Sequence, residues 1–280
     1  MSQATTTIDE RGSTRGRVFR ARAASFIQRQ GALLALVVVC VLATTRYEDF
    51  LTERNLLNVL RQNSMLGLVA LGMTFVILTG GIDLSVGSLL AVAGVIAANL
   101  AGRGMLLAVL AAVAFTTVLG LVNGVVIAKA RIQPFIVTLA MMIAARGLAL
   151  AATGEESVRV DKLSETFTWL GQGKLGPIPI PVVVLLVAYA VGWLVLNHTR
   201  FGRHVYSLGD NEEAARLMGL NVGRVTLGVY ALSGALAGLA GVILASRLGA
   251  GQPVAGTGWE LDAIAAVVVG GTLLTGGQGG

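Results

Sequence analysis

The sequence is dominated by long stretches that contain no charged residue. Between flanking charges these stretches cover residues 30–45, 62–82, 84–102, 104–128, 175–199 and 225–246. Most of them supply the roughly 20 helical residues that cross the hydrocarbon core of a bilayer. With 55% hydrophobic and only 13% charged residues, the chain has more apolar surface than a soluble domain can bury. The sequence therefore predicts a membrane protein built of transmembrane helices.

Two further stretches complete the predicted bundle. Residues 132–152 form a seventh span, which carries Arg146 inside it, and an eighth begins near Asp262 but soon meets a glycine-rich stretch and is incomplete. We expect an all-α, polytopic membrane helix bundle of about eight spans over residues 30–280, preceded by a basic segment at residues 1–29. That segment holds six arginines and no long apolar run, so it does not predict a cleaved signal peptide.

The distribution of Lys and Arg predicts the orientation of the chain. A cytoplasmic N-terminus places 12 of these residues inside and 9 outside, which agrees with the positive-inside rule. Residues 153–180 then form an external loop, which is either a connector or a docking surface for a partner. Residues 198–224 form a cytoplasmic loop. Because the basic residues flank spans and do not alternate with aromatic residues, we expect no nucleic-acid partner.

The cytoplasmic loop contains one stretch that favours a helix. Residues 211–218 lie between Gly209 and Gly219, and glycines suit the ends of a short helix. Asp210 or Asn211 can cap its first turn, where Glu213 also favours the positive end of the helix dipole. The sequence predicts a short capped helix presented to the cytoplasm, and the alternative is a solvated loop.

Four stretches of the sequence resemble a known family. They are LTGGIDLSVGS (78–88), GLVNGVVIAKARIQPFIVTLAMMIAARGLAL (120–150), GDNEEAARLMGLNV (209–222) and VVVGGTLLTGGQGG (267–280). In order and spacing they resemble the ribose, xylose and galactoside permeases of bacterial ABC importers. The resemblance implies a multi-pass inner-membrane permease subunit that translocates a monosaccharide. It implies neither enzyme activity nor a cofactor.

The resemblance also implies partners. These are a separate ATP-binding subunit that powers transport, a periplasmic or lipid-anchored sugar-binding protein, and a second permease chain in a homodimer or heterodimer. A branched-chain amino acid ABC permease or a secondary transporter is the alternative function. Family members continue for several tens of residues beyond the glycine-rich fourth stretch, so we expect the sequence to be truncated at its C-terminus.

In that family, the segment similar to residues 209–222 is the coupling element that sits in a cleft of the ATP-binding subunit. The resemblance carries this role to the matching positions Gly209, Asn211, Glu213, Ala214, Ala215 and Gly219. Small alanine side chains allow close approach to a partner surface, and a glycine allows the chain to turn back toward the membrane.

Four polar residues within the apolar runs are candidates for the substrate pathway. Asp83 forms either a capped tight turn or a functional carboxylate in a broken intramembrane helix. Asn123 and Thr138 either bond neighbouring helices or bind sugar hydroxyls. Arg146 either extends to the membrane surface or lines the pathway, because a guanidinium at the centre of a span is costly.

Overall fold

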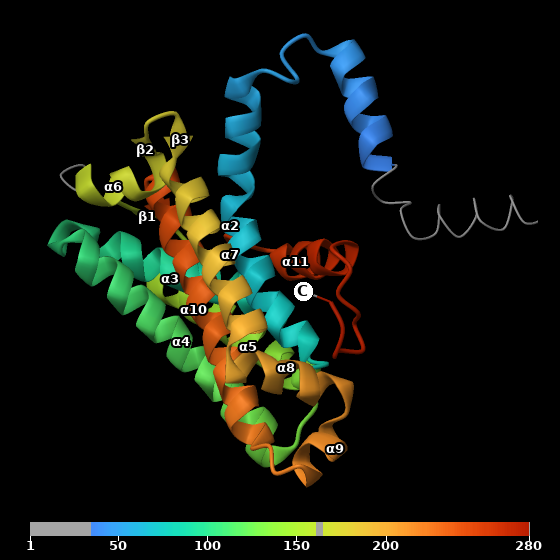
Figure 1. Ribbon diagram of the computed structural model, residues 1–280. Coiled ribbons are helices and arrows are strands. Elements are labelled where there is room, and N and C mark those ends of the chain that lie inside the picture. The colour runs from blue at the N-terminus through green and yellow to red at the C-terminus, as the bar shows by residue number, and fades with distance from the viewer. Residues whose placement is uncertain (1–34, 161–164, 280) are drawn as a thin grey trace, which may run out of the picture. The chain divides into compact units, whose positions relative to one another are not determined.

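The computed structural model describes residues 35–160 and 165–279 (Figure 1). The predicted basic segment 1–29 lies outside this range. The described chain divides into two units, residues 1–56 and 57–280, of which the second contains most of the helices. In the first unit, an apolar helix covers Ala35–Arg46, within the first predicted span.

Six helices are long and apolar enough to cross a bilayer, counted over the described residues. They are α2 (Glu53–Leu78), α3 (Val86–Leu100, continued by the 3-10 turn η1 at Ala101–Arg103), α4 (Met105–Ala130), α5 (Pro134–Thr153), α7 (Ile180–His198) and α10 (Val222–Leu248). The prediction of a helical membrane bundle is therefore confirmed, with six candidate spans in the described chain.

The remaining elements are short and lie at the ends of the bundle. They are α6 (Glu165–Gln172), α8 (Arg200–Asp210), α9 (Glu212–Leu217), α11 (Trp259–Val269) and the strands β1 (Val158–Arg159), β2 (Lys174–Leu175), β3 (Ile178–Pro179) and β4 (Ala250–Gly251). The strands form two antiparallel pairs, β1 with β4 and β2 with β3. Figure 1 shows β1–β3 and α6 at one end of the bundle, here called the strand end, and α8 and α9 at the opposite α9 end.

The core lies among α2, α3 and α10. In these helices 61–72% of the apolar window is buried, whereas in α4, α5 and α7 only 17–28% is buried. The outer helices therefore present wide apolar faces, which bilayer lipid or another membrane chain can cover without the cost that water would impose. This arrangement is that of a membrane bundle and not of a soluble core.

Helices α4 and α10 pack closely through glycines. A Cβ on Gly120 of α4 would lie 3.3 Å from the Cα of Gly234 on α10, and would also collide with the carbonyl oxygen of Tyr230. Gly124 faces the backbone of Leu227 in the same way. Glycine spacing of this kind lets helix backbones approach closely in membranes.

Several predicted boundaries differ from the structure. Helix α2 begins at Glu53, well before residue 62, and includes Arg61, which limits the predicted charge-free run. Helix α7 begins at Ile180 and not at residue 175, because the β2–β3 hairpin occupies the preceding residues. The incomplete eighth span corresponds to α11, which ends where Gly271 adopts a φ of 103°.

Candidate functional site

The chain is not helical between α2 and α3, at residues 79–85. Gly80 adopts a φ of 76°, a conformation that glycine reaches at little cost, and α2 ends just before it. Asp83 follows in the turn and is fully buried. The chain therefore makes a turn at this position, and the turn separates α2 from α3.

The buried carboxyl group of Asp83 is surrounded by hydrogen-bond donors. One oxygen, Oδ1, accepts from the backbone N–H of Ser85 at 2.9 Å and from the Ser85 hydroxyl at 2.6 Å. The other, Oδ2, accepts from the hydroxyl of Ser233 on α10 at 2.8 Å. The Ser85 hydroxyl therefore donates to Asp83, and it makes no capping bond to α3. Three donors offset much of the cost of burying a carboxyl group.

Two of the other predicted pathway residues meet the same turn. The side-chain amide of Asn123 on α4 donates to the Ser85 hydroxyl at 3.1 Å, and the Thr138 hydroxyl on α5 donates to the Ile82 carbonyl at 3.2 Å. Both residues are fully buried. We call Asp83, Ser85, Asn123 and Ser233 the Asp83 network. The turn therefore gathers polar groups from α3, α4 and α10 at one point, with α5 beside it.

Two buried polar atoms near this network have no hydrogen-bond partner among the described residues. They are Oδ1 of Asn123 and the hydroxyl of Tyr230, which is one helical turn from Ser233 on α10. The hydroxyl lies against Gly81, where a Cβ would be 2.7 Å away. The sequence offered no sign of Tyr230, because a tyrosine within an apolar helix is usually a packing residue.

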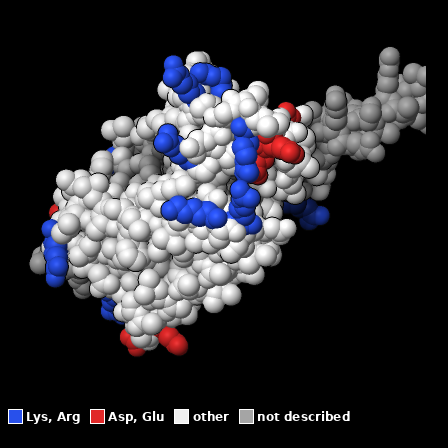
Figure 2. Space-filling model, turned by 90° about the horizontal axis from the view of Figure 1, so that it is seen from below, with Lys and Arg blue, Asp and Glu red and all other residues white. Residues whose placement is uncertain are grey.

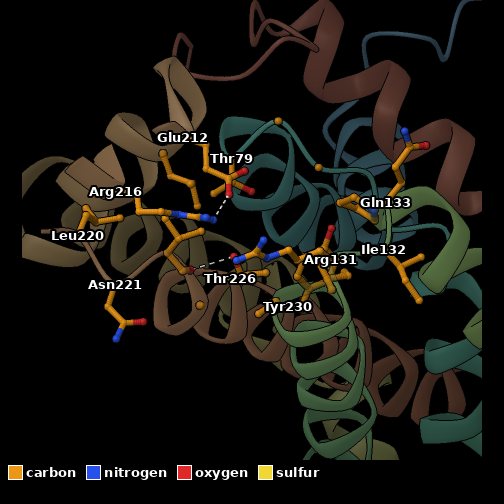
Figure 3. Close-up of a pocket in the computed structure, with 18 of the residues that line it drawn as sticks. Thr79, Arg131, Ile132, Gln133, Glu212, Arg216, Leu220, Asn221, Thr226 and Tyr230 are labelled. Atoms are coloured by element: carbon orange, nitrogen blue, oxygen red, sulfur yellow. Dashed lines mark hydrogen bonds and ion pairs between the residues drawn. The ribbon is translucent and has the colours of Figure 1, made fainter. Parts of the chain in front are cut away.

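A cavity of about 920 Å³ lies between this turn and the α9 end (Figure 3). Its lining includes Gly80 and Gly81 of the turn, Arg131 and Gln133 of the α4–α5 connection, and Tyr230. The lining also includes Glu212, Arg216 and residues 219–223 beside α9. The cavity therefore extends from α9 to the turn at residues 79–85, which also carries Asp83.

Helix α9 is short and capped at both ends. The Asn211 side chain accepts from the backbone N–H of Ala214 at 2.9 Å. Gly219 has a φ of 85° and donates to the Arg216 carbonyl, while Leu220 donates to the Ala215 carbonyl, each at 3.0 Å. This pair of bonds is the Schellman arrangement that ends many helices. The predicted caps at Asn211 and Gly219 are confirmed.

The exposed side of α9 ends in two apolar side chains. Leu217 is 84% exposed and Met218 is 76% exposed, whereas Ala215 is fully buried against the rest of the chain. Glu212 and Arg216 form an exposed ion pair at 2.7 Å, and Glu213 is exposed beside them. Exposed apolar side chains at the tip of a rigid element are typical of a surface that meets a partner.

The α9 end is rich in basic residues. Seen from that end, Figure 2 shows Lys and Arg side chains distributed over the face, with fewer acidic ones. Four elements or their ends contribute these residues, namely Lys129, Arg131, Arg200, Arg203, Arg216 and Arg224. An excess of Lys and Arg at one end is the pattern that membrane proteins show on their cytoplasmic side.

Helix α8 contacts the end of α2 at Gly209. Gly209 lies inside α8 and is not a cap of α9, so that prediction is wrong. A side chain there would collide with the Leu78 carbonyl oxygen, which also accepts from the backbone N–H of Gly277 at 3.0 Å. A Cβ on Gly276 would lie 2.8 Å from the Gly80 backbone N. We call Gly80, Gly209 and Gly276 the three-glycine junction.

Two side-chain contacts hold α8 beside this junction. The ring of Phe201 stacks on that of Phe75 in α2, with centroids 6.4 Å apart and planes at 26°. The Tyr206 hydroxyl donates to the Gly279 carbonyl at 2.8 Å. Helix α8 is therefore fixed to the last turns of α2 and to the glycine-rich stretch at residues 275–279, directly before α9.

Arg146, the fourth predicted pathway residue, lies apart from the Asp83 network. It is two turns beyond Thr138 on α5, and its Nη1 donates to the carbonyl oxygens of Pro253 at 2.6 Å and Ala255 at 2.8 Å. The side chain is partly buried. It therefore contacts protein at this depth, in the connection between α10 and α11.

The chain is similar to known transport proteins. Residues 55–278 match the family model described as "Branched-chain amino acid transport system / permease component". The chain is 46% identical over 259 residues to the ribose import permease protein of Escherichia coli (strain K12), covering 91% of this chain and 81% of that protein.

Two further relatives are permeases for other pentoses. The chain is 40% identical to the L-arabinose ABC transporter permease protein of Azospirillum brasilense, over 90% of this chain and 74% of that one. It is 34% identical to the xylose transport system permease protein of Haemophilus influenzae, over 88% and 83% respectively. No solved structure gives a significant match.

The Ser233→Ala substitution tests the Asp83 network. It removes one donor from a buried carboxyl group, and we expect the free energy of unfolding to fall by about 1–3 kcal/mol. The matched control is Ser207→Ala on α8, whose hydroxyl bonds only the Arg203 carbonyl of its own helix. Unfolding in detergent micelles measures both variants, and equal stability of the two would contradict the assigned role of Ser233.

Proposed function

Because the chain belongs to the permease family of bacterial ABC importers, we propose that it is the transmembrane subunit of an importer for a pentose. Membership of this family makes it an inner-membrane transport component and not an enzyme. The observation that carries the proposal is the 46% identity to a ribose permease over nearly the whole chain, together with the exposed α9 helix.

The substrate class rests on the relatives. The family model takes its description from branched-chain amino acid transport, but the similar permeases are named for ribose, L-arabinose and xylose. All three are five-carbon sugars, whose hydroxyl groups need donors and acceptors along their route. The Asp83 network offers both kinds of group within the bundle.

The orientation places the α9 end in the cytoplasm. This choice is supported by the basic residues on that end and puts α6 and the strand pairs outside the membrane. With one further span before α2, this orientation also gives a cytoplasmic N-terminus. The loop 153–180 is then the external docking surface for a sugar-binding protein.

Helix α9 is the element that the ATP-binding subunit contacts. The helix is capped at both ends, and its Ala215 is buried against the rest of the chain. Leu217 and Met218 are exposed, so the helix projects an apolar surface that can enter a cleft and transmit force. Movement of α9 passes to α8 and through the three-glycine junction to the turn at residues 79–85. A ligand or partner shifts a conformational equilibrium only through contacts that differ between the two states, and this junction supplies such a contact.

The substrate pathway follows the cavity and the Asp83 network. A sugar leaving toward the cytoplasm would pass the polar groups of Asn123 and Thr138 and then the cavity lined by Arg131 and Tyr230. A second copy of the chain or a related permease completes the pore, since α5 and α4 present largely exposed apolar faces.

Uptake by reconstituted transporter tests the function. In proteoliposomes containing this permease, its ATP-binding subunit and its sugar-binding protein, radiolabelled D-ribose, L-arabinose or D-xylose should accumulate when ATP is supplied. Labelled leucine should not accumulate. Uptake of leucine and of none of the three pentoses would show that the amino acid alternative is correct.

The Leu217→Asp substitution tests α9 as the docking element. Leu217 is 84% exposed, so its replacement leaves the permease fold intact, but a charge at a central apolar contact should weaken binding of the ATP-binding subunit by about 2 kcal/mol, or roughly 30-fold. Leu175→Asp is the matched control, because Leu175 is 62% exposed at the strand end. Copurification measures both, and equal recovery of the subunit would count against this surface.

A further inference from the structure

The connection between α10 and α11, residues 249–258, runs inward from the strand end. Its first residues form β4, which pairs with β1 in the register Val158 with Gly251 and Arg159 with Ala250. It then follows α3 in the opposite direction, with Gly251 against Gly94 and later Gly256 against Gly87. The connection therefore links the loop at the strand end to the first turn of α3, directly beside the Asp83 network.

Glycines allow this connection to lie flush against α3. A Cβ on Gly251 would collide with the carbonyl oxygen of Gly94. In the same way, a Cβ on Gly87 would collide with the carbonyl oxygen of Gly256. The two backbones are therefore in direct contact at these positions. Ala255, near the end of the connection, also packs against the hydrophobic core.

The Arg146 side chain on α5 makes polar contacts with this connection. One nitrogen of its guanidinium donates to two carbonyl oxygens, those of Pro253 and Ala255, at 2.6 and 2.8 Å. The Glu260 carboxylate at the start of α11 attracts the same guanidinium and lies against Gly87. These contacts satisfy a charge that is costly within a membrane and tie α5 to the connection.

We propose that Arg146 is the positioning residue that latches the α10–α11 connection onto α3 and so closes the outer side of the sugar pathway. This proposal rests on the proposed function and its orientation, and it assigns Arg146 a role through the connection rather than a contact with the sugar. Helix α5 carries both Thr138, which bonds the Ile82 carbonyl, and Arg146. A shift of α5 therefore changes the turn and the latch together.

The two states differ in the partners of the guanidinium. In the closed state it bonds the two carbonyl groups, and in the open state water replaces them once the outer side is hydrated. A discrete contact that is made in one state and lost in the other is what alternating access requires. Events at the β1 loop outside the membrane then reach the Asp83 network through residues 249–258.

A labelling experiment tests the latch directly. The permease carries Cys40→Ser, which removes the one cysteine of this sequence, and Ala255→Cys, and it is assembled with its partners in intact spheroplasts. A membrane-impermeant maleimide then reports the exposure of position 255 from outside. Arg146→Gln should raise the labelling rate about tenfold, because it removes charge-assisted bonds that hold the connection.

Two further variants separate positioning from general instability. Arg146→Lys keeps the charge and a donor, so labelling should stay within about twofold of the parent. Arg103→Gln removes an exposed arginine at the end of η1, at the strand end of the bundle, and it should leave the rate unchanged. Equal labelling of Arg146→Gln and the parent overturns the proposal, as does an increase of the same size in Arg103→Gln.

A transport measurement completes the test. In proteoliposomes, Arg146→Gln should lower the ratio of pentose taken up to ATP hydrolysed by about tenfold, and Arg146→Lys should restore most of it. An unchanged ratio in Arg146→Gln would overturn the assigned role in transport. If the parent takes up none of the pentoses, the proposed function has failed, while the labelling rates still decide whether Arg146 positions the connection.

Discussion

The contact between Gly209 of α8 and the Leu78 carbonyl at the end of α2 is the constraint around which this structure is organised. Helix α2 must end there, because the chain next enters the turn that holds Asp83, and its last carbonyl groups need partners. The Gly277 N–H supplies one partner, and the absence of a side chain on Gly209 leaves room for it. Three segments far apart in the sequence therefore meet at one carbonyl group.

Two features follow from this junction. The first is the Asp83 network, where breaking the helix inside an apolar bundle exposes backbone groups and a carboxyl group that must find partners from α3 and α10. The second is the rigid position of α8, fixed by the Phe75–Phe201 stack, so that the exposed helix α9 begins at a defined place. The exposed helix α9 and the polar centre of the bundle are therefore linked through α8 and the end of α2.

The sequence predicts much of the fold because charge-free runs and glycine spacing are local signals. The six long helices and the short capped helix at Asn211 follow from such signals. The sequence does not reveal the role of Gly209, because a glycine that permits close packing and a glycine that ends a helix look the same until the packed segment, here the end of α2, is known. The hydrogen bond from Ser233 to Asp83 joins residues 150 positions apart, and no spacing rule could reveal it.

The most direct test of the account is the ratio of sugar taken up to ATP hydrolysed in Gly209→Ala. The added methyl group would collide with the Leu78 carbonyl oxygen, whereas in the control Gly223→Ala it would lie 3.6 Å from its nearest neighbour, an ordinary contact. The account predicts that the ratio falls about tenfold in Gly209→Ala and stays near that of the parent in Gly223→Ala. An unchanged ratio in Gly209→Ala would contradict a coupling route through this junction.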